Sequence, residues 1–386
     1  MGSFNDTPGA APVSLPQWLR HQAQWHGADV ALRHKHLGIW QVQTWAQVAD
    51  EVSRLAAGLQ AHGFAAGATL TILSRPRPQA LLAALAAQWL GGVASLFDPL
   101  QPGAEQLPLL AALQPDFVLV EGLEELQRLH AAQLAPGVLI YLDRRGLSAS
   151  GPFVDALDYA ALLAHRPADE PALLGQAQHT AFVFYREEAQ AIEEQRLSHA
   201  ELLREGQHLV EREALGRQEE ALAARAFASA GQARYLLAPW LIAGFRLNFP
   251  ENLATRDRDR RELGPTLVAG TRETYTRLHG YALERLPLPG SWTRRLVDWA
   301  LAAPSGPLQR YLGHWLVRRP LRDVLGFSRT RAPLLVGDAL SPETQAFFDN
   351  LGIRVRHWSD SAQWETPAHS VRNIPDDWAE HQPQLA

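Results

Sequence analysis

Short apolar runs and helical stretches alternate along the chain, and this alternation predicts the fold class. From Thr44 onward Val48, Val52 and Leu55 recur at helical spacing, which predicts a helix that Thr44 caps. Buried strands are predicted at Thr69–Ser74, Val93–Phe97, Phe117–Val120, Val138–Leu142, Thr180–Tyr185, Thr266–Ala269, Ala332–Val336 and Ile353–Trp358. Strands separated by helices of about 10 to 15 residues are typical of mostly parallel sheets with helices on their faces. The pattern therefore predicts an α/β protein.

The same pattern predicts that the chain contains two α/β units. We expect the first at residues 15–175 and the second at residues 176–366, because Gly151–Gln178 has weak periodicity and several prolines. Residues 289–319 are predicted to form a helical insertion in the second subdomain. Residues 367–386 form a polar tail.

Composition narrows the class of protein. Hydrophobic residues make up 46% of the 386 positions and charged residues 20%, as in ordinary globular proteins. A net charge of −5 gives no electrostatic reason to expect a nucleic-acid partner. The absence of cysteine excludes disulfides and thiolate metal sites, and it fits a reducing cytoplasm.

No membrane span or signal peptide is predicted. The longest apolar stretch, Leu81–Phe97, is interrupted by Gln88 and by Gly91 and Gly92, and the N-terminus has no charged region followed by an apolar run. We therefore expect a cytoplasmic protein. The insertion described below leaves a membrane-peripheral location open.

Several stretches, in order, resemble the ANL superfamily of adenylate-forming enzymes and most closely its long-chain acyl-CoA synthetases. The similar stretches are Leu32–Trp45, Leu70–Leu90, Thr180–His199, Pro320–Asp323 and, after Gly337, Leu340–Glu343. The resemblance implies the fold of the N-terminal domain of those enzymes, with an active-site cleft between two stacked α/β subdomains. It also implies an ancestral reaction in which ATP and a fatty acid give acyl-adenylate and pyrophosphate, after which CoA accepts the acyl group.

The resemblance places a phosphate loop, Y-T-S-G-T-T-G-x-P-K-G in the family, between Tyr185 and Ser198. Its glycines let backbone N–H groups approach phosphates, while its hydroxyls and lysine add hydrogen bonds and charge. This chain has no glycine, serine, threonine or lysine there, and it has four glutamates between Glu187 and Glu194. A glutamate about 4 Å from a phosphate charge would oppose binding by roughly 4 kcal/mol at an effective dielectric near 20. We expect a solvated, partly helical surface segment and no phosphate site.

A second family motif, G-Y-G-x-T-E, holds adenine and Mg²⁺, and it aligns with residues 357–362. Gly337, Trp358 and Ser361 would mark a vestigial nucleotide site, whereas Ala362 stands where the metal ligand is expected. Two interpretations of Trp358 are open. Its indole either still stacks on a ring of the ligand or fills the vacated pocket as a core residue.

The family's catalytic lysine belongs to a C-terminal domain that the polar tail does not resemble. Lys35 is the only lysine of the chain and matches neither of the family's lysine positions. No catalytic residue is therefore predicted. His34 and His36 lack a third ligand at recognisable spacing, so no metal site is predicted either.

The insertion offers a candidate contact surface. Trp292 and Trp299 recur at helical spacing, and Arg318 and Arg319 follow. Such helices could bind a protein partner or a membrane surface. In the competing interpretation they cover the interface between the subdomains and expose their arginines to water.

The leading hypothesis is an acyl-CoA synthetase homologue that is catalytically inactive and acts as a lipid-binding, scaffolding or regulatory pseudoenzyme. Its expected ligand is a long-chain acyl group, and no cofactor is expected. One alternative is a residual or split fatty acid–CoA ligase that uses ATP and Mg²⁺. The other is a peripheral membrane or transporter-associated subunit.

Overall fold

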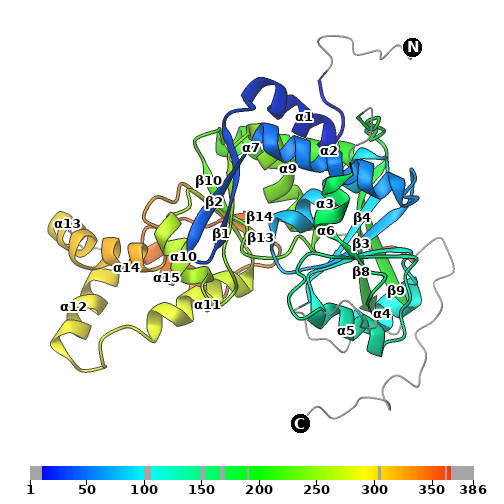
Figure 1. Ribbon diagram of the computed structural model, residues 1–386. Coiled ribbons are helices and arrows are strands. Elements are labelled where there is room, and N and C mark those ends of the chain that lie inside the picture. Colours follow the sequence, from blue (N-terminus) through cyan, green and yellow to red (C-terminus); the bar gives the residue numbers. More distant parts are fainter. Residues whose placement is uncertain are drawn as a thin grey trace.

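The structure is a computed structural model that describes residues 11–99, 106–147, 153–165, 170–188, 191–302, 306–360 and 363–366. Two seven-stranded sheets carry the described fold (Figure 1). One has the order β7 (Leu157–Asp158), β6 (Val138–Tyr141), β5 (Phe117–Val120), β3 (Thr69–Leu73), β4 (Val93–Phe97), β8 (Thr180–Glu188) and β9 (Ala191–Ser198). The other has the order β14 (Arg356–Trp358), β13 (Ala332–Val336), β12 (Leu267–Gly270), β10 (Glu220–Leu222), β11 (Arg246–Phe249), β1 (Val30–His36) and β2 (Ile39–Thr44).

Parallel pairing dominates both sheets, and each ends in one antiparallel hairpin, β8–β9 or β1–β2. The predicted α/β class with mostly parallel sheets is confirmed. The predicted strands are present, although the last is shorter than expected and spans Arg356–Trp358. The division into subdomains at residues 175 and 176 stays a prediction.

Helices between and around the sheets share one continuous apolar core. They are α1 (Leu15–His26), α2 (Trp45–Ala61), α3 (Pro78–Trp89), α6 (Tyr159–Ala164), α7 (His199–Glu213), α8 (Ala230–Gln232), the π-helical turn η1 (Ala233–Leu237) and α9 (Ala238–Ala243). Trp45 stacks on Trp240 with ring centroids 4.7 Å apart, and the indole N–H of Trp240 donates to the carbonyl of Ala31 at 3.0 Å. These buried aromatic contacts tie α2 and α9 to β1.

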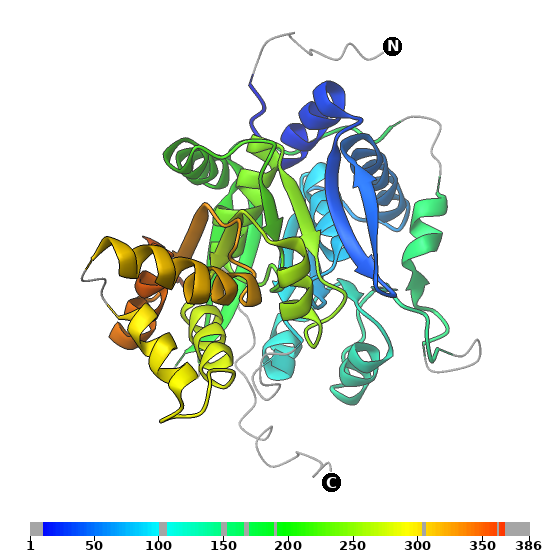
Figure 2. The same cartoon turned by 90° about the vertical axis from the view of Figure 1, so that its left-hand side faces the viewer.

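Four further helices belong to two smaller apolar clusters at opposite ends of the molecule. Helices α4 (Gln106–Leu113) and α5 (Leu123–Ala131) pack beside β5, whereas α11 (Arg272–Leu283) and α15 (Pro342–Asn350) pack against β12 and β13. Helix α10 (Arg256–Leu263) lies near β1. Figure 2 shows the helices of the yellow and orange segments gathered at one end of the molecule.

Helix starts follow the capping signals of the sequence. The Thr44 hydroxyl accepts from the Gln47 amide at 3.3 Å, and the Gln47 side chain accepts from the Thr44 amide at 2.9 Å. Ser198 and Glu201 form the same reciprocal pair at the start of α7. Each box satisfies backbone N–H groups that the first turn of a helix leaves unpaired.

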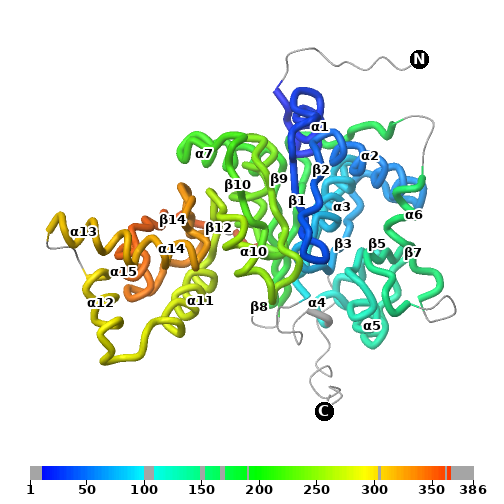
Figure 3. Tube along the Cα trace, turned by 60° about the vertical axis from the view of Figure 1, so that its left-hand side comes forward, coloured from blue at the N-terminus to red at the C-terminus, as the bar shows by residue number. Residues whose placement is uncertain are grey.

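The predicted insertion is helical and contains α12 (Trp292–Leu301), α13 (Pro307–Gly313), the π-helical turn η2 (His314–Arg318) and α14 (Arg319–Val324). We call residues 292–324 the arm. Figures 1 and 3 show α12 and α13 projecting at one end of the molecule, far from the sheet that contains β3 and β5. The interpretation that these helices cover an interface between subdomains is therefore wrong. In the described part of the chain, no helix combines the length and hydrophobicity that crossing a membrane requires.

Candidate functional site

The segment expected to replace the phosphate loop is a β-hairpin rather than a partly helical surface. Strands β8 and β9 pair in antiparallel register, with Arg186 opposite Glu193 and Tyr185 opposite Glu194. Residues 189 and 190 lie outside the described part. Ile192 is buried against the cluster around α4 and α5, which anchors one face of the hairpin. The expected helical character is wrong because cross-strand pairing and this burial outweigh the helix propensity of glutamate and alanine.

The charges of the hairpin are paired within the protein. The Arg186 guanidinium contacts the Glu193 carboxylate at 2.6 Å, and Arg196 contacts Glu194 at 2.6 Å. The Glu194 carboxylate is only 7% exposed, so it is a buried negative charge. An oxygen at this position repels a phosphate instead of holding it.

The open edge of β9 is also covered. Glu194 and Glu365 exchange two backbone hydrogen bonds, at 2.8 and 2.9 Å, and Arg186 lies 4.5 Å from the centre of the Trp364 ring. The outward N–H group of Glu194 is therefore bonded within the protein, whereas a phosphate loop presents free N–H groups to its ligand.

Trp358, at the end of β14, lies in a cage of side chains. Its ring contacts Arg212 at 4.9 Å, the edge of His208 at 5.4 Å and Tyr235 at 5.6 Å, all as distances to ring centres. Trp358 is 5% exposed and belongs to the main core. A purine that stacked on this indole would have to displace one of these neighbours.

Gly337 lies beside Trp358, as the resemblance implied. Its amide donates to the carbonyl of Trp358 at 3.1 Å, and its φ of +87° is one that glycine adopts without strain. Ser361, the third residue predicted for the vestigial nucleotide site, lies outside the described residues. Assignment of the three residues to such a site stays a prediction.

A polar cavity of about 350 Å³ adjoins Trp358. Arg234 closes one side through an ion pair with Asp360 at 2.6 Å, and the Tyr235 hydroxyl donates to the carbonyl of Ser359 at 2.8 Å. Burial, reinforced by the nearby Asp360, raises the pKa of Tyr235 to about 12, so this phenol stays protonated at neutral pH. The arginines that line the cavity are Arg196, Arg204, Arg212 and Arg234.

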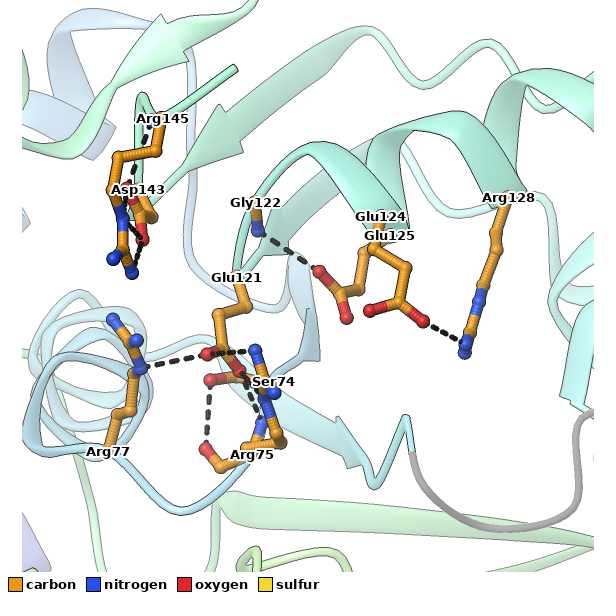
Figure 4. Close-up of polar contacts among 10 residues, drawn as sticks. All are labelled: Ser74, Arg75, Arg77, Glu121, Gly122, Glu124, Glu125, Arg128, Asp143 and Arg145. Carbon is orange, nitrogen blue, oxygen red and sulfur yellow. Dashed lines mark hydrogen bonds and ion pairs between the residues drawn. The ribbon is translucent and has the colours of Figure 1, made fainter. Parts of the chain in front are cut away.

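A second and larger cleft of about 1020 Å³ lies where strands of the other sheet end. Figure 4 shows its polar floor, formed by the loops that follow β3, β5 and β6. The opposite wall comes from β1, β2 and the loop at residues 250–253. The carboxyl ends of parallel strands are the usual location of ligand sites in open α/β sheets.

Glu121 organises this floor. Its carboxylate is buried and accepts from the Arg75 backbone N–H at 3.0 Å and from the Arg75 guanidinium at 2.8 and 2.9 Å. The Arg77 guanidinium also contacts it, at 2.9 Å. Two arginines therefore share this one carboxylate, and both also line the cleft.

The histidine nearest to this cluster is neutral. Burial, with Arg77 and His36 adding, lowers the pKa of His34 to about 4. Lys35 points to the other face of β1, where its ammonium contacts Asp259 at 2.8 Å and also Glu262. Burial alone would lower the pKa of Lys35, but the hydrogen bonds to both carboxylates raise it above its usual value, so the amine stays charged and paired.

The sequence analysis did not identify Arg75, Arg77 and Glu121 as a group. A signal was present, because each follows directly after a predicted buried strand, where parallel strands place their loops together. Within the described residues, no three His, Cys, Asp or Glu side chains are arranged to hold a metal ion.

Comparison with known proteins identifies the fold. Residues 19–185 match the family of AMP-binding enzymes. A structure named for a long-chain-fatty-acid CoA ligase of Rhodopseudomonas palustris is 16% identical with a TM-score of 0.64, over 89% of this chain and 74% of that one. The didomain of a carboxylic acid reductase from Segniliparus rugosus, in complex with AMP, is 14% identical with a TM-score of 0.68, over 91% and 52%.

An anthranilate CoA ligase in complex with anthranoyl-AMP is also similar, at 15% identity and a TM-score of 0.64, over 89% of this chain and 60% of that one. The chain thus spans between about half and three quarters of the length of these solved proteins. No curated protein sequence matches it. At these identities the likeness establishes the fold.

Proposed function

We propose that this chain, which has the fold of the adenylate-forming enzymes and matches the AMP-binding enzyme family over residues 19–185, is a catalytically inactive pseudoenzyme of that superfamily. In this role it binds a long-chain acyl or related carboxylic-acid ligand, or serves as a scaffold or regulator, without activating the ligand with ATP. The observation that carries the proposal is the closed β8–β9 hairpin in the place of the phosphate loop.

Electrostatics support the loss of ATP handling. Two glutamates of the hairpin, Glu193 and Glu194, are fixed by arginines, and a third and fourth, Glu187 and Glu188, stay exposed near its tip. Each carboxylate within about 4 Å of a phosphate charge would oppose binding by roughly 4 kcal/mol. The backbone N–H of Glu194 does not offset this repulsion, because it is bonded to Glu365.

The cleft above Glu121 supports binding of a carboxylate. The guanidinium groups of Arg75 and Arg77 line the cleft, and such planar groups bind carboxylates in two-point contacts. A solved relative is in complex with AMP and a co-purified carboxylic acid, which motivates the class of ligand proposed here.

The proposal is tested by two assays on the full chain. Pyrophosphate release in the presence of ATP, Mg²⁺, CoA and palmitate should stay at the level of a no-protein control. Binding of a fluorescent long-chain fatty acid should be saturable and weakened several-fold by Arg77→Gln, with Arg54→Gln on α2 as the control. Pyrophosphate release above background would sink the proposal.

The alternative is a residual or split fatty acid–CoA ligase, which would use ATP and Mg²⁺. Retention of the whole two-sheet framework supports it, and the hairpin opposes it. A separately supplied C-terminal domain would have to restore both a lysine and a phosphate site. The same pyrophosphate assay, repeated with a C-terminal domain from an active ligase added, distinguishes this alternative.

A second candidate role is peripheral association with a membrane surface or a protein partner. The arm supports it, because Trp292 is 76% exposed and Trp299 39% exposed. Arg319 lies 4.5 Å from the centre of the Trp315 ring and is exposed. Arg318, in contrast, donates to the carbonyls of Ala300 and Ala302, so its role is to fix the arm rather than to reach a partner.

A further inference from the structure

The arm exposes an apolar stripe that a globular protein normally buries. Along the continuous helix of α13 and η2, large apolar side chains recur at positions i, i+3, i+4, i+7 and i+8, the spacing of one helix face. Their exposed fractions are 68% for Leu308, 64% for Tyr311, 37% for Leu312, 49% for Trp315 and 56% for Leu316. This stripe faces outward, and Trp292 adds a further exposed indole at the start of α12.

The opposite face of the same helix is packed against α12. Gly313 approaches Ala300 so closely that a side chain at position 313 would meet it at 3.3 Å, and Val317 is buried. The Gln309 amide donates to the carbonyl of Trp299 at 2.7 Å, and Arg318 donates to Ala300 at 3.0 Å. The outward orientation of the stripe is therefore fixed by the packing of the other face.

Charge distinguishes the arm from the rest of the chain. Six arginines and two aspartates lie between Trp292 and Val324, which gives the arm a net charge of +4 in a protein whose net charge is −5. Arg295, Arg310 and Arg319 are exposed. An apolar stripe with aromatic rings and flanking arginines matches helices that lie in the plane of an anionic lipid surface.

We propose that the arm binds the surface of an anionic lipid bilayer. The stripe from Leu308 to Leu316 enters the boundary between head groups and acyl chains, and the arginines contact lipid phosphates. The inference rests on the peripheral role proposed above and names its partner. It is independent of the proposed loss of ATP handling, since Figure 1 shows α12 and α13 on the opposite side of the molecule from β8 and β9.

The test is co-sedimentation of the full chain with vesicles of phosphatidylcholine alone and of phosphatidylcholine with 30% phosphatidylglycerol. We expect binding to the anionic vesicles that is at least tenfold stronger than to the neutral ones and that weakens with added salt. The double variant Tyr311→Ser with Trp315→Ser should lower binding at least tenfold. Arg310→Gln with Arg319→Gln should remove most of the preference for anionic lipid.

A control variant checks that exposed tryptophan alone is not responsible. Trp25→Ala changes an indole that is 71% exposed on α1, outside the arm, and should leave binding unchanged. Circular dichroism verifies that each variant stays folded. Binding of the wild type to neither vesicle, or equal binding of wild type and arm variants, would overturn the proposal. Concentration-dependent self-association that the stripe variant abolishes, without vesicle binding, would overturn it in favour of a protein partner.

The ATP and pyrophosphate measurements do not depend on the arm. A chain that fails to bind vesicles but also lacks ATP turnover would refute only the membrane partner. A chain that binds vesicles and releases pyrophosphate would refute only the inactive-enzyme proposal.

Discussion

His199 joins the start of α7 to the start of α1, and this contact depends on its protonation state. The ring Nδ1 accepts from the Leu15 amide at 3.2 Å, which requires a neutral imidazole with the proton on Nε2. Burial, with a small contribution from His179, lowers the pKa of His199 to about 3. His199 is fully buried, so this contact forms part of the packing between α1 and α7.

We predict that, because of this residue, the protein becomes less stable as the pH is lowered. The unfolded chain takes up a proton on His199 near pH 6.5, whereas the folded chain does so only near pH 3, so the free energy of unfolding decreases as the pH drops through this window. Between pH 7 and pH 5 the loss from His199 should be about 2 kcal/mol, measured by urea unfolding. His199→Asn, which keeps an acceptor for Leu15, should show a shallower pH dependence. An identical slope in both proteins would contradict the assignment.

Glu121 gives a second prediction at this scale. Its buried carboxylate accepts from two arginines, so Glu121→Gln removes charge-assisted hydrogen bonds and should lower the free energy of unfolding by about 2 kcal/mol. The matched control is Glu124→Gln, since Glu124 is 64% exposed and its ion pair with Arg128 lies on the surface. That change should cost less than about 1 kcal/mol. Equal losses in urea unfolding would show that Glu121 does not organise the cleft.

The β8–β9 hairpin shows what local pattern leaves undetermined at the scale of elements. The sequence shows that the glycines, hydroxyls and lysine of the family's phosphate loop are missing between Tyr185 and Ser198. It predicted the strand Thr180–Tyr185 but not the extension of β8 or the strand β9. Glutamate and alanine favour helix, and the pairing of Arg186 with Glu193 is visible only once the two strands meet. The bond between Glu194 and Glu365 joins distant segments, and no local rule predicts it.

In the arm, too, the local pattern predicts the helices but not which of their faces is exposed. The spacing of Trp292 and Trp299 predicted helices correctly, but an apolar stripe does not reveal what it faces. Packing of Gly313 against Ala300 decides that Leu308 and its neighbours turn outward. Periodicity describes one helix at a time. The exposure of the stripe is therefore visible only in the tertiary structure.

A pair of helical glycines tests the packing of elements. At Gly58 in α2 a Cβ would lie 2.8 Å from the backbone oxygen of Leu162 in α6, whereas at Gly280 in α11 nothing lies within 4 Å. Gly58→Ala should therefore destabilise the protein by about 1–3 kcal/mol. Gly280→Ala should stabilise it by about 0.4–1 kcal/mol, because alanine loses less backbone entropy in a helix. Thermal unfolding of both variants checks the sign, and stabilisation by Gly58→Ala would contradict the close approach of α2 and α6.

At the scale of the whole molecule, most of the secondary structure follows from the sequence. Strands such as Thr69–Leu73 and Ala332–Val336 are short apolar runs, and their bounds match the predicted ones closely. The order of the strands does not follow from these runs. Strand β1 pairs with β11, and β8 pairs with β4, so each sheet draws strands from distant parts of the chain. These long-range pairings were not predicted, because local periodicity does not contain them.

The candidate site, too, was predicted from the sequence only in part. Gly337 donates to the carbonyl of Trp358, whereas the assignment of both residues to a vestigial nucleotide site stays a prediction. The cage of Arg212, His208 and Tyr235 around Trp358 was not predicted, because it combines α7, η1 and β14. Sequence patterns located the positions that depart from the family motifs, and the tertiary structure shows which side chains surround them.

The central claim is that the fold persists without a nucleotide site, and calorimetric titration of the full chain with ATP–Mg²⁺ tests it most directly. The account predicts no saturable heat at millimolar ATP, because the β8–β9 hairpin offers carboxylates and sheet-bonded amides to the phosphates. Saturable binding with one site per chain would contradict it, since the hairpin would then have to open and release Glu365 to hold the triphosphate.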